Sequence, residues 1–275
     1  IPKYLMDYLT IFCMSLNNDH LNTIKDLGYT PVGLNKENFS KEWLRDNSGD
    51  NISDKNSFYG EYTFYYWYWK NLLKNKKDNE WVGFCSYREY WGNNKDNDSK
   101  KLNDLVLKNY DQSWSRYDSI IGKPIFVGGT KVSKVLKYGK MALLRNPRAL
   151  FSKKGRTIRW QFEMFHGIKN LDLAIDLLPD KDREEFRLFT RTKNSFSRGN
   201  MFITKSSKII NDYFEYIFDW LNKCEKIFGF NLEGYGQVRM YTFLAERFLP
   251  FWFQKYTNYL EWPVIFHDIN KNDKI

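Results

Sequence analysis

Two side chains with complementary chemistry follow an apolar stretch of the chain at residues 81–85. This stretch, WVGFC, has the composition of a short buried strand, and Ser86, Tyr87, Arg88 and Glu89 come directly after it. Ligands of open α/β sheets bind beyond the carboxyl ends of the central strands. The guanidinium of Arg88 can pair bidentately with a diphosphate and neutralise it without a metal. Glu89 is a candidate general base, although an ordinary surface Arg–Glu pair explains the same two residues equally well.

The preferred candidates for the base, His166 and Glu163, lie in residues 161–178, which we expect to be helical. Glu163 and His166 are three positions apart and would share a face of that helix. Histidine carries protons near neutral pH, and a nearby carboxylate can orient it. A hydrogen-bonded structural histidine is the alternative reading. The chain has no HExxH motif and no Cys/His cluster, so the sequence predicts no metal site, while the need for a divalent metal stays undecided.

Further polar side chains stand where loops meet the predicted elements, and we expect them to bind substrate. The polar loop before residue 56 supplies groups for ribose or sugar hydroxyls, and the other candidates follow later in the chain. The full set comprises Asp46, Asp50, Asn51, Glu61, Tyr87, Arg88, Asn200, Gln237, Arg239, Glu246 and Arg247. Glu246 and Arg247 could equally form a buried ion pair.

The predicted elements that position these groups alternate between strands and helices. Strands are expected at 9–16, 28–34 and 119–127, with a break at Gly122 and Pro124. A short helix that ends at Leu27 is expected after the first strand. A second helix is expected over the aromatic run at 62–69, with Ser57 as its N-cap, and further helices at 180–193, 209–228 and 238–249. Pro250 should end the last of these. The segment after Pro263 reads as a weakly ordered polar tail, and His20 reads more readily as a surface loop residue than as a nucleotide contact.

Composition favours anionic partners. The 275 residues carry a net charge of +10, and 19% of them are aromatic, which suits either a large core or a cleft for sugar rings. No recognised nucleic-acid motif accompanies the charge, and the sequence has neither GxGxxG nor a P-loop. Cys13, Cys85 and Cys224 read as reduced core thiols. With no signal peptide and no long apolar run, we expect a cytoplasmic protein.

The segment Lys131–Arg159 contains no acidic residue, although Lys and Arg recur along it between apolar side chains. This pattern favours a basic amphipathic segment that docks on an anionic membrane surface, at the inner face of the cell membrane. A cationic loop that holds phosphate is the alternative.

Five segments together carry a family resemblance over roughly residues 9–253. They are NISDKNSFYGEYTFYYWYWKN, WVGFCSYREYW, QFEMFHGIKNLDLAIDLL, RGNMFI and YGQVRMYTFLAERFL. In this order they resemble a bacterial family of uncharacterised-domain proteins, glycosyltransferases of capsule, exopolysaccharide and lipopolysaccharide biosynthesis, some of which are similar to β-galactofuranosyltransferases. That family often has His-Tyr-Arg-Arg after the strand. Here the residues are Ser86-Tyr87-Arg88-Glu89, so roles of that His and second Arg are not carried over.

The resemblance implies a single α/β domain over residues 1–275 of GT-A-like type. It would have a mixed central sheet, flanking helices and a helical C-terminal half. It also implies transfer of a sugar, with galactofuranose as the expected one, from a UDP-linked donor to a glycan or lipid-linked glycan acceptor. Arg88 in place of a metal-binding carboxylate pair, together with a single base, favours inverting, metal-independent transfer. A rival from another class is a non-catalytic cationic module that binds polysaccharide or anionic membrane, which would explain the charge and the aromatic residues without a nucleotide site.

Overall fold

The chain forms two compact units in the computed structural model, which describes residues 6–35, 38–93, 99, 101–129, 144, 147, 152 and 155–272. Unit 1 comprises Ile1–Lys123, Gly199–Glu215 and Phe253–Ile275, and unit 2 comprises Pro124–Arg198 and Tyr216–Trp252. Two long helices, α11 (Ser207–Phe228) and α13 (Met240–Tyr256), each contribute to both units. The expected single glycosyltransferase-like domain stays a prediction.

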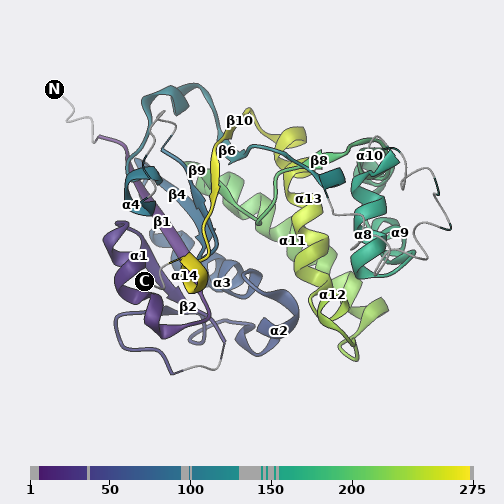
Figure 1. The fold of residues 1–275 in the computed structure, drawn as a ribbon, viewed down its shortest axis with the longest axis horizontal. Helices are drawn as coiled ribbons and strands as arrows, with labels where there is room; N and C mark the ends of the chain where they lie inside the picture. Colours follow the sequence, from purple (N-terminus) through teal and green to yellow (C-terminus); the bar gives the residue numbers. More distant parts are fainter. Residues whose placement is uncertain are drawn as a thin grey trace. The chain divides into compact units, whose positions relative to one another are not determined.

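A mixed sheet is the centre of unit 1 (Figure 1). Within the described residues its strand order is β10-β6-β9-β4-β1-β2-β3, and β5 and β11 extend it beside β4. The strands are β1 (Tyr8–Ser15), β2 (Thr30–Gly33), β3 (Leu44–Arg45), β4 (Glu80–Ser86), β5 (Glu89–Trp91), β6 (Ser119–Gly122), β9 (Phe202–Thr204), β10 (Tyr259–Trp262) and β11 (Val264–Phe266). On the main path only β9 runs antiparallel to its neighbours. The expected mixed central sheet of an α/β fold is confirmed.

Both faces of the sheet are apolar, because successive residues of the central strands point to opposite faces and are buried on each. Phe12 of β1 stands opposite Phe84 of β4, and their rings lie 5.9 Å apart on one face. The next pair, Cys13 and Cys85, points to the other face, where both thiols are buried and free as expected. Strands covered on both sides read as continuous apolar runs, which is why the sequence identifies them.

The aromatic run at 62–69 covers the Phe12–Phe84 face. It begins α3 (Tyr62–Trp67), which passes into a π-helical turn at Tyr68–Leu72, and a 3-10 turn at Leu73–Asn75 follows. Ser57 does not cap this helix, because it lies inside a separate short helix, α2 (Asn56–Tyr59). Gly60, with φ +55°, ends α2 in a conformation that only glycine adopts readily, so α3 begins after it.

The remaining elements of unit 1 are short. They are the 3-10 turns Asn18–His20, Ser53–Lys55 and Gln112–Arg116 and the helices α1 (Leu21–Asp26), α4 (Leu102–Leu105) and α14 (Ile269–Asn272). The segment after Pro263 is therefore not the weakly ordered tail expected from its polar composition. Through residue 272 it forms β11 and α14, and it is anchored by the buried side chains of Asp268 and Ile269.

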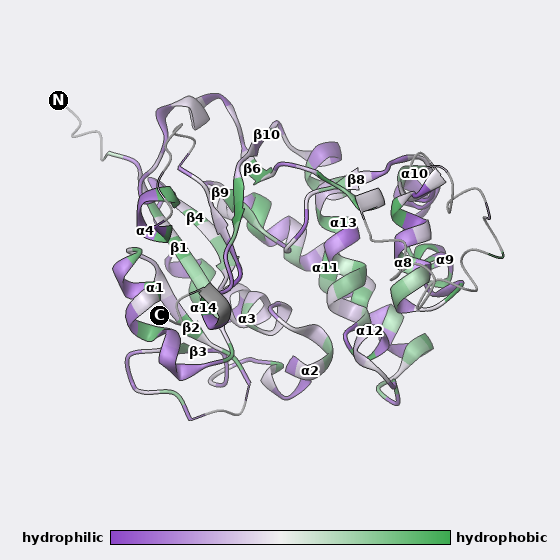
Figure 2. Cartoon of the chain, in the orientation of Figure 1, coloured by the Kyte–Doolittle hydropathy of each residue, from purple (hydrophilic) through white to green (hydrophobic). Residues whose placement is uncertain are grey.

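Unit 2 is mainly helical. Its elements are β7 (Ile125–Phe126), β8 (Ser195–Phe196), a 3-10 turn at Val127–Gly129, and the helices α8 (Ile158–His166), α9 (Asn170–Asp176), α10 (Asp180–Thr192) and α12 (Tyr235–Val238). Figure 2 shows hydrophilic and hydrophobic residues alternating along α11, as expected for a helix with one buried side. Pro250 lies inside α13 instead of ending it. A proline removes only one backbone bond, and burial of Phe251, Trp252 and Phe253 accompanies the continued helix.

Candidate active site

The carboxyl ends of four parallel strands meet at one edge of the unit 1 sheet. β1, β2, β3 and β4 run in the same direction and end at Ser15, Gly33, Arg45 and Ser86. Because β1 is followed in sequence by β2 on one side and paired with β4 on the other, the strand order reverses between β1 and β4. Such a reversal is where open α/β sheets bind ligands. The residues that follow β1 and β4 therefore define the candidate site.

His20 is the last residue of the 3-10 turn that follows β1, and its ring is held from three directions. Nδ1 lies 2.8 Å from Ser15 Oγ, and Nε2 lies 3.0 Å from Oδ1 of Asn270 in α14. The Tyr87 ring packs against the imidazole with centroids 5.1 Å apart. His20 is 3% exposed, so the expectation of a surface loop histidine is wrong. The 3-10 turn at Asn18–His20 directs the ring inward, and neighbouring sequence does not reveal this.

Arg88 carries the cation of this edge. Its Nε lies 3.5 Å from Oδ2 of Asp268, and its guanidinium carbon lies 4.8 Å from the centre of the Tyr87 ring. The Arg88 side chain is 48% exposed, whereas that of Asp268 is 6% exposed. Within the described part of the chain, neither Nη group of Arg88 makes a hydrogen bond to the protein. Both groups can therefore bind an anion that arrives from solvent.

Glu89, the first residue of β5, lies next to Arg88 and close to a glycine from elsewhere in the chain. A Cβ added to Gly199 would overlap Glu89 Oε2, so the carboxylate packs against the backbone there. Gly199 has φ +88°, which L-residues rarely adopt. β5 also pairs with β11, which places Phe266 opposite Glu89. The half-buried Glu89 carboxylate is thus held at the same edge as Arg88.

The buried side chain of Asn200, the residue after Gly199, forms a polar cluster with the half-buried Glu61. Asn200 Nδ2 donates to Glu61 Oε1 at 2.7 Å, and Tyr62 Oη donates to Asn200 Oδ1 at 3.2 Å. Tyr65 Oη donates to the Asn200 carbonyl at 2.7 Å. Asn200 has φ +53° and precedes β9 by two residues, so it is a left-handed turn residue before the strand. In this geometry Asn200 orders the loop, and contact of either residue with substrate stays a prediction.

The three candidates of the loop after β3 differ in their surroundings. Asp46 is buried, and burial raises the pKa of its carboxyl, partly offset by the Thr63 hydroxyl. Within the described residues neither Asp46 oxygen makes a hydrogen bond of standard geometry. Asp50 is exposed and accepts from Tyr66 Oη at 3.1 Å, whereas Asn51 Oδ1 accepts from Ser53 in a local turn. The Asn51 side chain also orders this turn, and contact of Asp46, Asp50 or Asn51 with a sugar stays a prediction.

His166 and Glu163 belong to α8 in unit 2. His166 Nδ1 lies 2.8 Å from the Gly236 carbonyl, and its ring stacks on Phe243 with centroids 4.0 Å apart. Burial, together with the charge of Arg247, lowers the pKa of His166 to about 3. The imidazole is therefore neutral and only weakly basic at neutral pH. Glu163 is buried and pairs with Arg159 at 3.3 Å.

Arg247 and Glu246, adjacent on α13, form an ion pair, and Arg247 also hydrogen-bonds the neutral side chain of Gln161. Arg247 Nη2 donates to Gln161 Oε1 at 3.0 Å, and its guanidinium carbon lies 4.8 Å from the centre of the Phe196 ring. Burial lowers the pKa of Arg247, and Glu246 opposes the shift. Of the two readings left open by the sequence, the buried ion pair is present. Gln237 is exposed on α12, and Arg239, half-buried, lies 5.8 Å over the Tyr235 ring.

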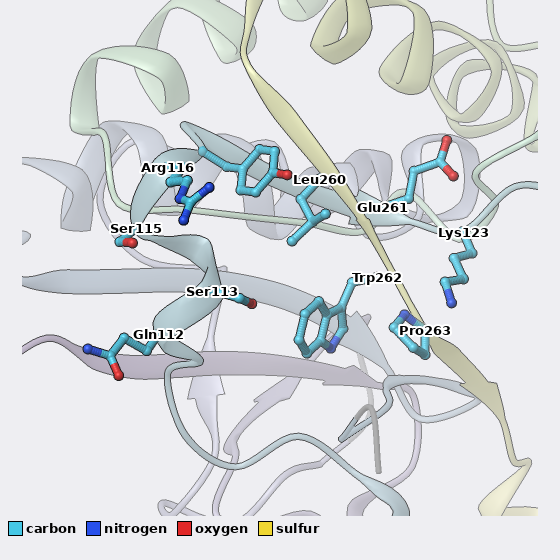
Figure 3. A pocket seen from close by; sticks show the side chains of 10 residues that line it. Gln112, Ser113, Ser115, Arg116, Lys123, Leu260, Glu261, Trp262 and Pro263 are labelled. Atoms are coloured by element: carbon cyan, nitrogen blue, oxygen red, sulfur yellow. The ribbon is translucent and has the colours of Figure 1, made fainter. Parts of the chain in front are cut away.

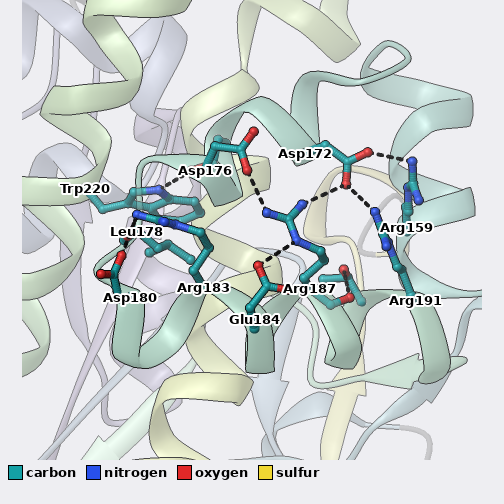
Figure 4. A network of polar contacts seen from close by, with 12 residues as sticks. Arg159, Asp172, Asp176, Leu178, Asp180, Arg183, Glu184, Arg187, Arg191 and Trp220 are labelled. Atoms are coloured by element: carbon teal, nitrogen blue, oxygen red, sulfur yellow. Dashed lines mark hydrogen bonds and ion pairs between the residues drawn. The ribbon is translucent and has the colours of Figure 1, made fainter.

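Most of the basic segment Lys131–Arg159 lies outside the described residues, so its membrane role stays a prediction. Two of its cations are described, and both make contacts within unit 2. Arg156 is buried and donates to the Gly128 carbonyl at 2.7 Å. Arg159 donates to Asp172 at 2.5 Å, and Asp172 also pairs with Arg187 and Arg191 in the network of Figure 4. Arg156 therefore ties the residues before α8 to the turn Val127–Gly129, and Arg159 links α8 to α9.

A separate hollow of about 710 Å³ lies along β10 in unit 1 (Figure 3). Its lining combines charged side chains, hydroxyls, an amide and rings, namely Gln112, Ser113, Ser115, Arg116, Tyr117, Lys123, Leu260, Glu261, Trp262 and Pro263. Within the described residues, the side chains of Arg116, Lys123 and Glu261 have no protein partner. Unpaired polar groups beside rings are suited to a hydroxyl-rich ligand.

The predicted residues fall into two groups. Glu61, Tyr87, Arg88, Glu89 and Asn200 lie in unit 1 around the ends of β4 and β5, and Asp46, Asp50 and Asn51 lie after β3 in the same unit. Glu163, His166, Gln237, Arg239, Glu246 and Arg247 lie in unit 2. Sequence reasoning missed Ser15, Asp268 and Asn270. The polar composition after Pro263 gave no sign that this segment returns to the sheet.

Neither a metal cluster nor a membrane span occurs in the described part of the chain. No group of three or more His, Cys, Asp and Glu side chains there is arranged to hold a metal ion. None of the described helices has both the length and the apolar character needed to cross a bilayer. Metal independence and location at the inner membrane face both stay predictions.

Comparison with known proteins adds a family and a fold. A family model described as a domain of unknown function (DUF4422) matches residues 14–258. The apo structure of WbbM, a bifunctional glycosyltransferase, is similar to this chain with a TM-score of 0.63 and 20% sequence identity. The similarity covers 94% of this chain and 45% of the WbbM chain, so this chain spans less than half of the length of WbbM. No curated protein matches the sequence.

Proposed function

Because this chain belongs to the family described as a domain of unknown function (DUF4422) and has the fold of a glycosyltransferase, we propose that it transfers a sugar from a nucleotide-activated donor to a glycan acceptor. The proposed donor is UDP-galactofuranose, and the proposed acceptor is a bacterial surface polysaccharide or its lipid-linked precursor. The similarity to WbbM, a bifunctional glycosyltransferase, supports glycosyl transfer, and the family resemblance of the sequence supports the galactofuranose donor.

One observation carries the proposal: Arg88 and Glu89 stand together at the strand-order reversal between β1 and β4. The exposed Nη groups of Arg88 lack protein partners within the described residues, so the guanidinium can take up a diphosphate. The half-buried carboxylate of Glu89 lies one residue away. A cation for the leaving group beside a carboxylate for the attacking hydroxyl is what displacement at an anomeric carbon requires.

The proposed reaction is a single displacement. The acceptor hydroxyl oxygen forms a bond to the anomeric carbon as the bond from that carbon to the diphosphate oxygen breaks, and UDP leaves with the electron pair. Arg88 balances the charge that develops on the diphosphate. The hydroxyl proton passes to the base, and the anomeric configuration inverts. The chemistry assigned to these residues requires no metal.

Among the three predicted bases we favour Glu89. His166 is nearly enclosed, stacks on Phe243 and has its pKa lowered to about 3, which leaves it a weak proton acceptor at neutral pH. Glu163 is buried and paired with Arg159. Glu89 is the one of the three that neighbours the proposed leaving-group residue in sequence and in unit 1. His166 and Glu163 then act in the packing of unit 2.

For the acceptor we propose the hollow along β10. Its unpaired donors and acceptors match sugar hydroxyls, and Tyr117 offers a ring to the apolar face of a sugar. The strand that lines it continues through Pro263 into β11, which pairs with β5 at Glu89. A lipid-linked acceptor would also suit the proposed docking of Lys131–Arg159 on an anionic membrane.

A donor screen tests the function directly. The protein is incubated with a panel of UDP-sugars and an extract of lipid-linked glycans, and release of UDP is followed. Release from one donor, dependent on the extract, is expected. The cationic-module alternative predicts that no donor is consumed, that UDP leaves the thermal stability unchanged, and that anionic vesicles are bound all the same.

A further inference from the structure

The segment His267–Asn270 is tied to the candidate site at three points. The backbone N–H of His267 donates to the Arg88 carbonyl at 3.0 Å, immediately after β11 pairs with β5. Asn270 Oδ1 lies 3.0 Å from His20 Nε2. Asp268 Oδ2 lies 3.5 Å from Arg88 Nε. The segment therefore reaches the residues that follow both β1 and β4.

Asp268 has a separate task for each carboxylate oxygen. Oδ1 accepts from the backbone N–H of Asn270 at 3.1 Å, which orders the start of α14. Oδ2 faces Arg88 Nε. The side chain of Asp268 is 6% exposed, whereas that of Arg88 is 48% exposed. A buried carboxylate, fixed in place, therefore holds the exposed guanidinium of Arg88 by its Nε atom.

The contact with Nε leaves the outer edge of the guanidinium open. The Tyr87 ring lies 4.8 Å from the guanidinium carbon, and the same ring packs against His20. His20 is in turn held by Ser15 and Asn270. One face of Arg88 thus lies over a braced ring, Nε is engaged by Asp268, and both Nη groups have no partner among the described residues. A ready-ordered arginine loses less rotamer entropy when it binds an anion.

We infer that Asp268 is a positioning residue that orders Arg88 for a diphosphate group, so that the C-terminal segment completes the donor site. The inference rests on the proposed function, because it assigns the diphosphate to Arg88. It adds that a segment with the composition of a tail contributes to nucleotide affinity. A purely structural role for Asp268, as the cap of α14, is the competing account.

The substitution Asp268→Asn separates the two accounts. Asparagine is as good an N-cap as aspartate, so its single side-chain oxygen can keep the bond to the Asn270 N–H. It then has no second oxygen and no charge for Arg88. Asp111→Asn is the matched control, since Asp111 caps the turn Gln112–Arg116 by accepting from the Ser113 N–H at 2.9 Å. Arg88→Ala and the double variant Arg88→Ala/Asp268→Asn complete the set.

Three probes are titrated into each variant: UDP and inorganic pyrophosphate by calorimetry, and uridine by NMR. We expect Asp268→Asn to weaken the binding of UDP and of pyrophosphate about tenfold, the size of a moderate coupling between neighbouring residues. The affinity for uridine should stay unchanged. Asp111→Asn should match the wild type for all three. In the Arg88→Ala background, Asp268→Asn should have no further effect, because its action passes through Arg88.

The outcomes distinguish this inference from the proposed function. Loss of UDP affinity in Arg88→Ala with wild-type affinity in Asp268→Asn overturns the positioning role and leaves the donor site standing. An equal loss of uridine affinity in Asp268→Asn also overturns it, because the whole site has then been disturbed. A wild-type protein that binds neither UDP nor pyrophosphate contradicts the proposed function itself.

Discussion

The carboxylate of Glu89 packs against the α-carbon of Gly199, so closely that a Cβ at residue 199 would overlap Oε2. Gly199 holds φ +88°, and Asn200 after it holds φ +53° through bonds to Glu61, Tyr62 and Tyr65. The buried polar cluster thereby fixes the backbone against which Glu89 rests. A carboxylate fixed in this way is prepared for one direction of proton transfer.

Replacing Glu89 by Gln should lower turnover by about 10²–10⁴-fold, the usual contribution of a general base, while UDP affinity stays unchanged. Glutamine keeps the size of the side chain but cannot accept the proton. Turnover is measured as UDP release with donor and acceptor present, and binding by calorimetry. Glu163→Gln and His166→Asn are the comparison variants. If either of them loses as much turnover as Glu89→Gln at unchanged stability, the assignment of the base is wrong.

Gly199→Ala should reduce both stability and turnover. The left-handed backbone costs an alanine more than about 1 kcal/mol in unfolding free energy, and the new methyl group must displace Glu89. Gly28→Ala is the matched control, because Gly28 has φ +78° and a Cβ added there would meet nothing within 4 Å. Both variants should unfold at lower urea, but turnover should fall only in Gly199→Ala. Equal turnover in the two would show that the contact with Glu89 has no catalytic consequence.

The buried His166 should make stability fall in mild acid. Its pKa is about 3 in the folded chain, whereas an unfolded histidine has a pKa of about 6.5. The unfolded state therefore binds more protons between these values, and the stability contributed above pH 6.5 is lost as the pH falls toward 3. Between pH 7 and 5 the loss is about 2 kcal/mol. Urea unfolding at both pH values should show it in the wild type and not in His166→Phe; the same loss in both would refute it.

Removing the unpaired cations of the β10 hollow should weaken binding of the glycan acceptor and leave binding of the donor unchanged. Arg116→Gln/Lys123→Gln eliminates two unpaired donors of charge-assisted hydrogen bonds, so KM for the glycan acceptor should rise about tenfold or more. The dissociation constant of UDP should not change. Lys181→Gln/Lys223→Gln, two surface lysines of unit 2, controls for the loss of net charge. An unchanged acceptor KM would remove the hollow from the account.

The sequence was informative where a pattern is local. The apolar run 81–85 is β4, and Arg88 and Glu89 stand at its carboxyl end as expected, because strands buried on both faces are continuous in sequence and end where polar residues begin. The helices at 209–228 and 180–193 follow their periodicity closely. The central strand and the polar edge beyond it were therefore within reach of sequence reasoning.

The remaining features depend on contacts between distant segments. The pairing of Asp268 with Arg88 and of Asn270 with His20 follows from β11 returning to β5, and no pattern near these residues announces that return. The αL conformation of Asn200 is set by Tyr62 and Tyr65 from another part of the chain. Pro250 fits inside α13 where the surrounding residues are buried. Tertiary packing decided each of these cases over local preference.

Hydrogen exchange measured with and without UDP tests the central claim most directly, namely that a nucleotide diphosphate binds where β1 and β4 end. UDP should slow exchange in the peptides that contain residues 15–20 and 86–91, and in the segment 264–270 that is tied to them. Arg88→Ala should abolish this protection while the exchange of the unliganded protein stays as in the wild type. Protection confined to unit 2, or no change on addition of saturating UDP, would contradict the account.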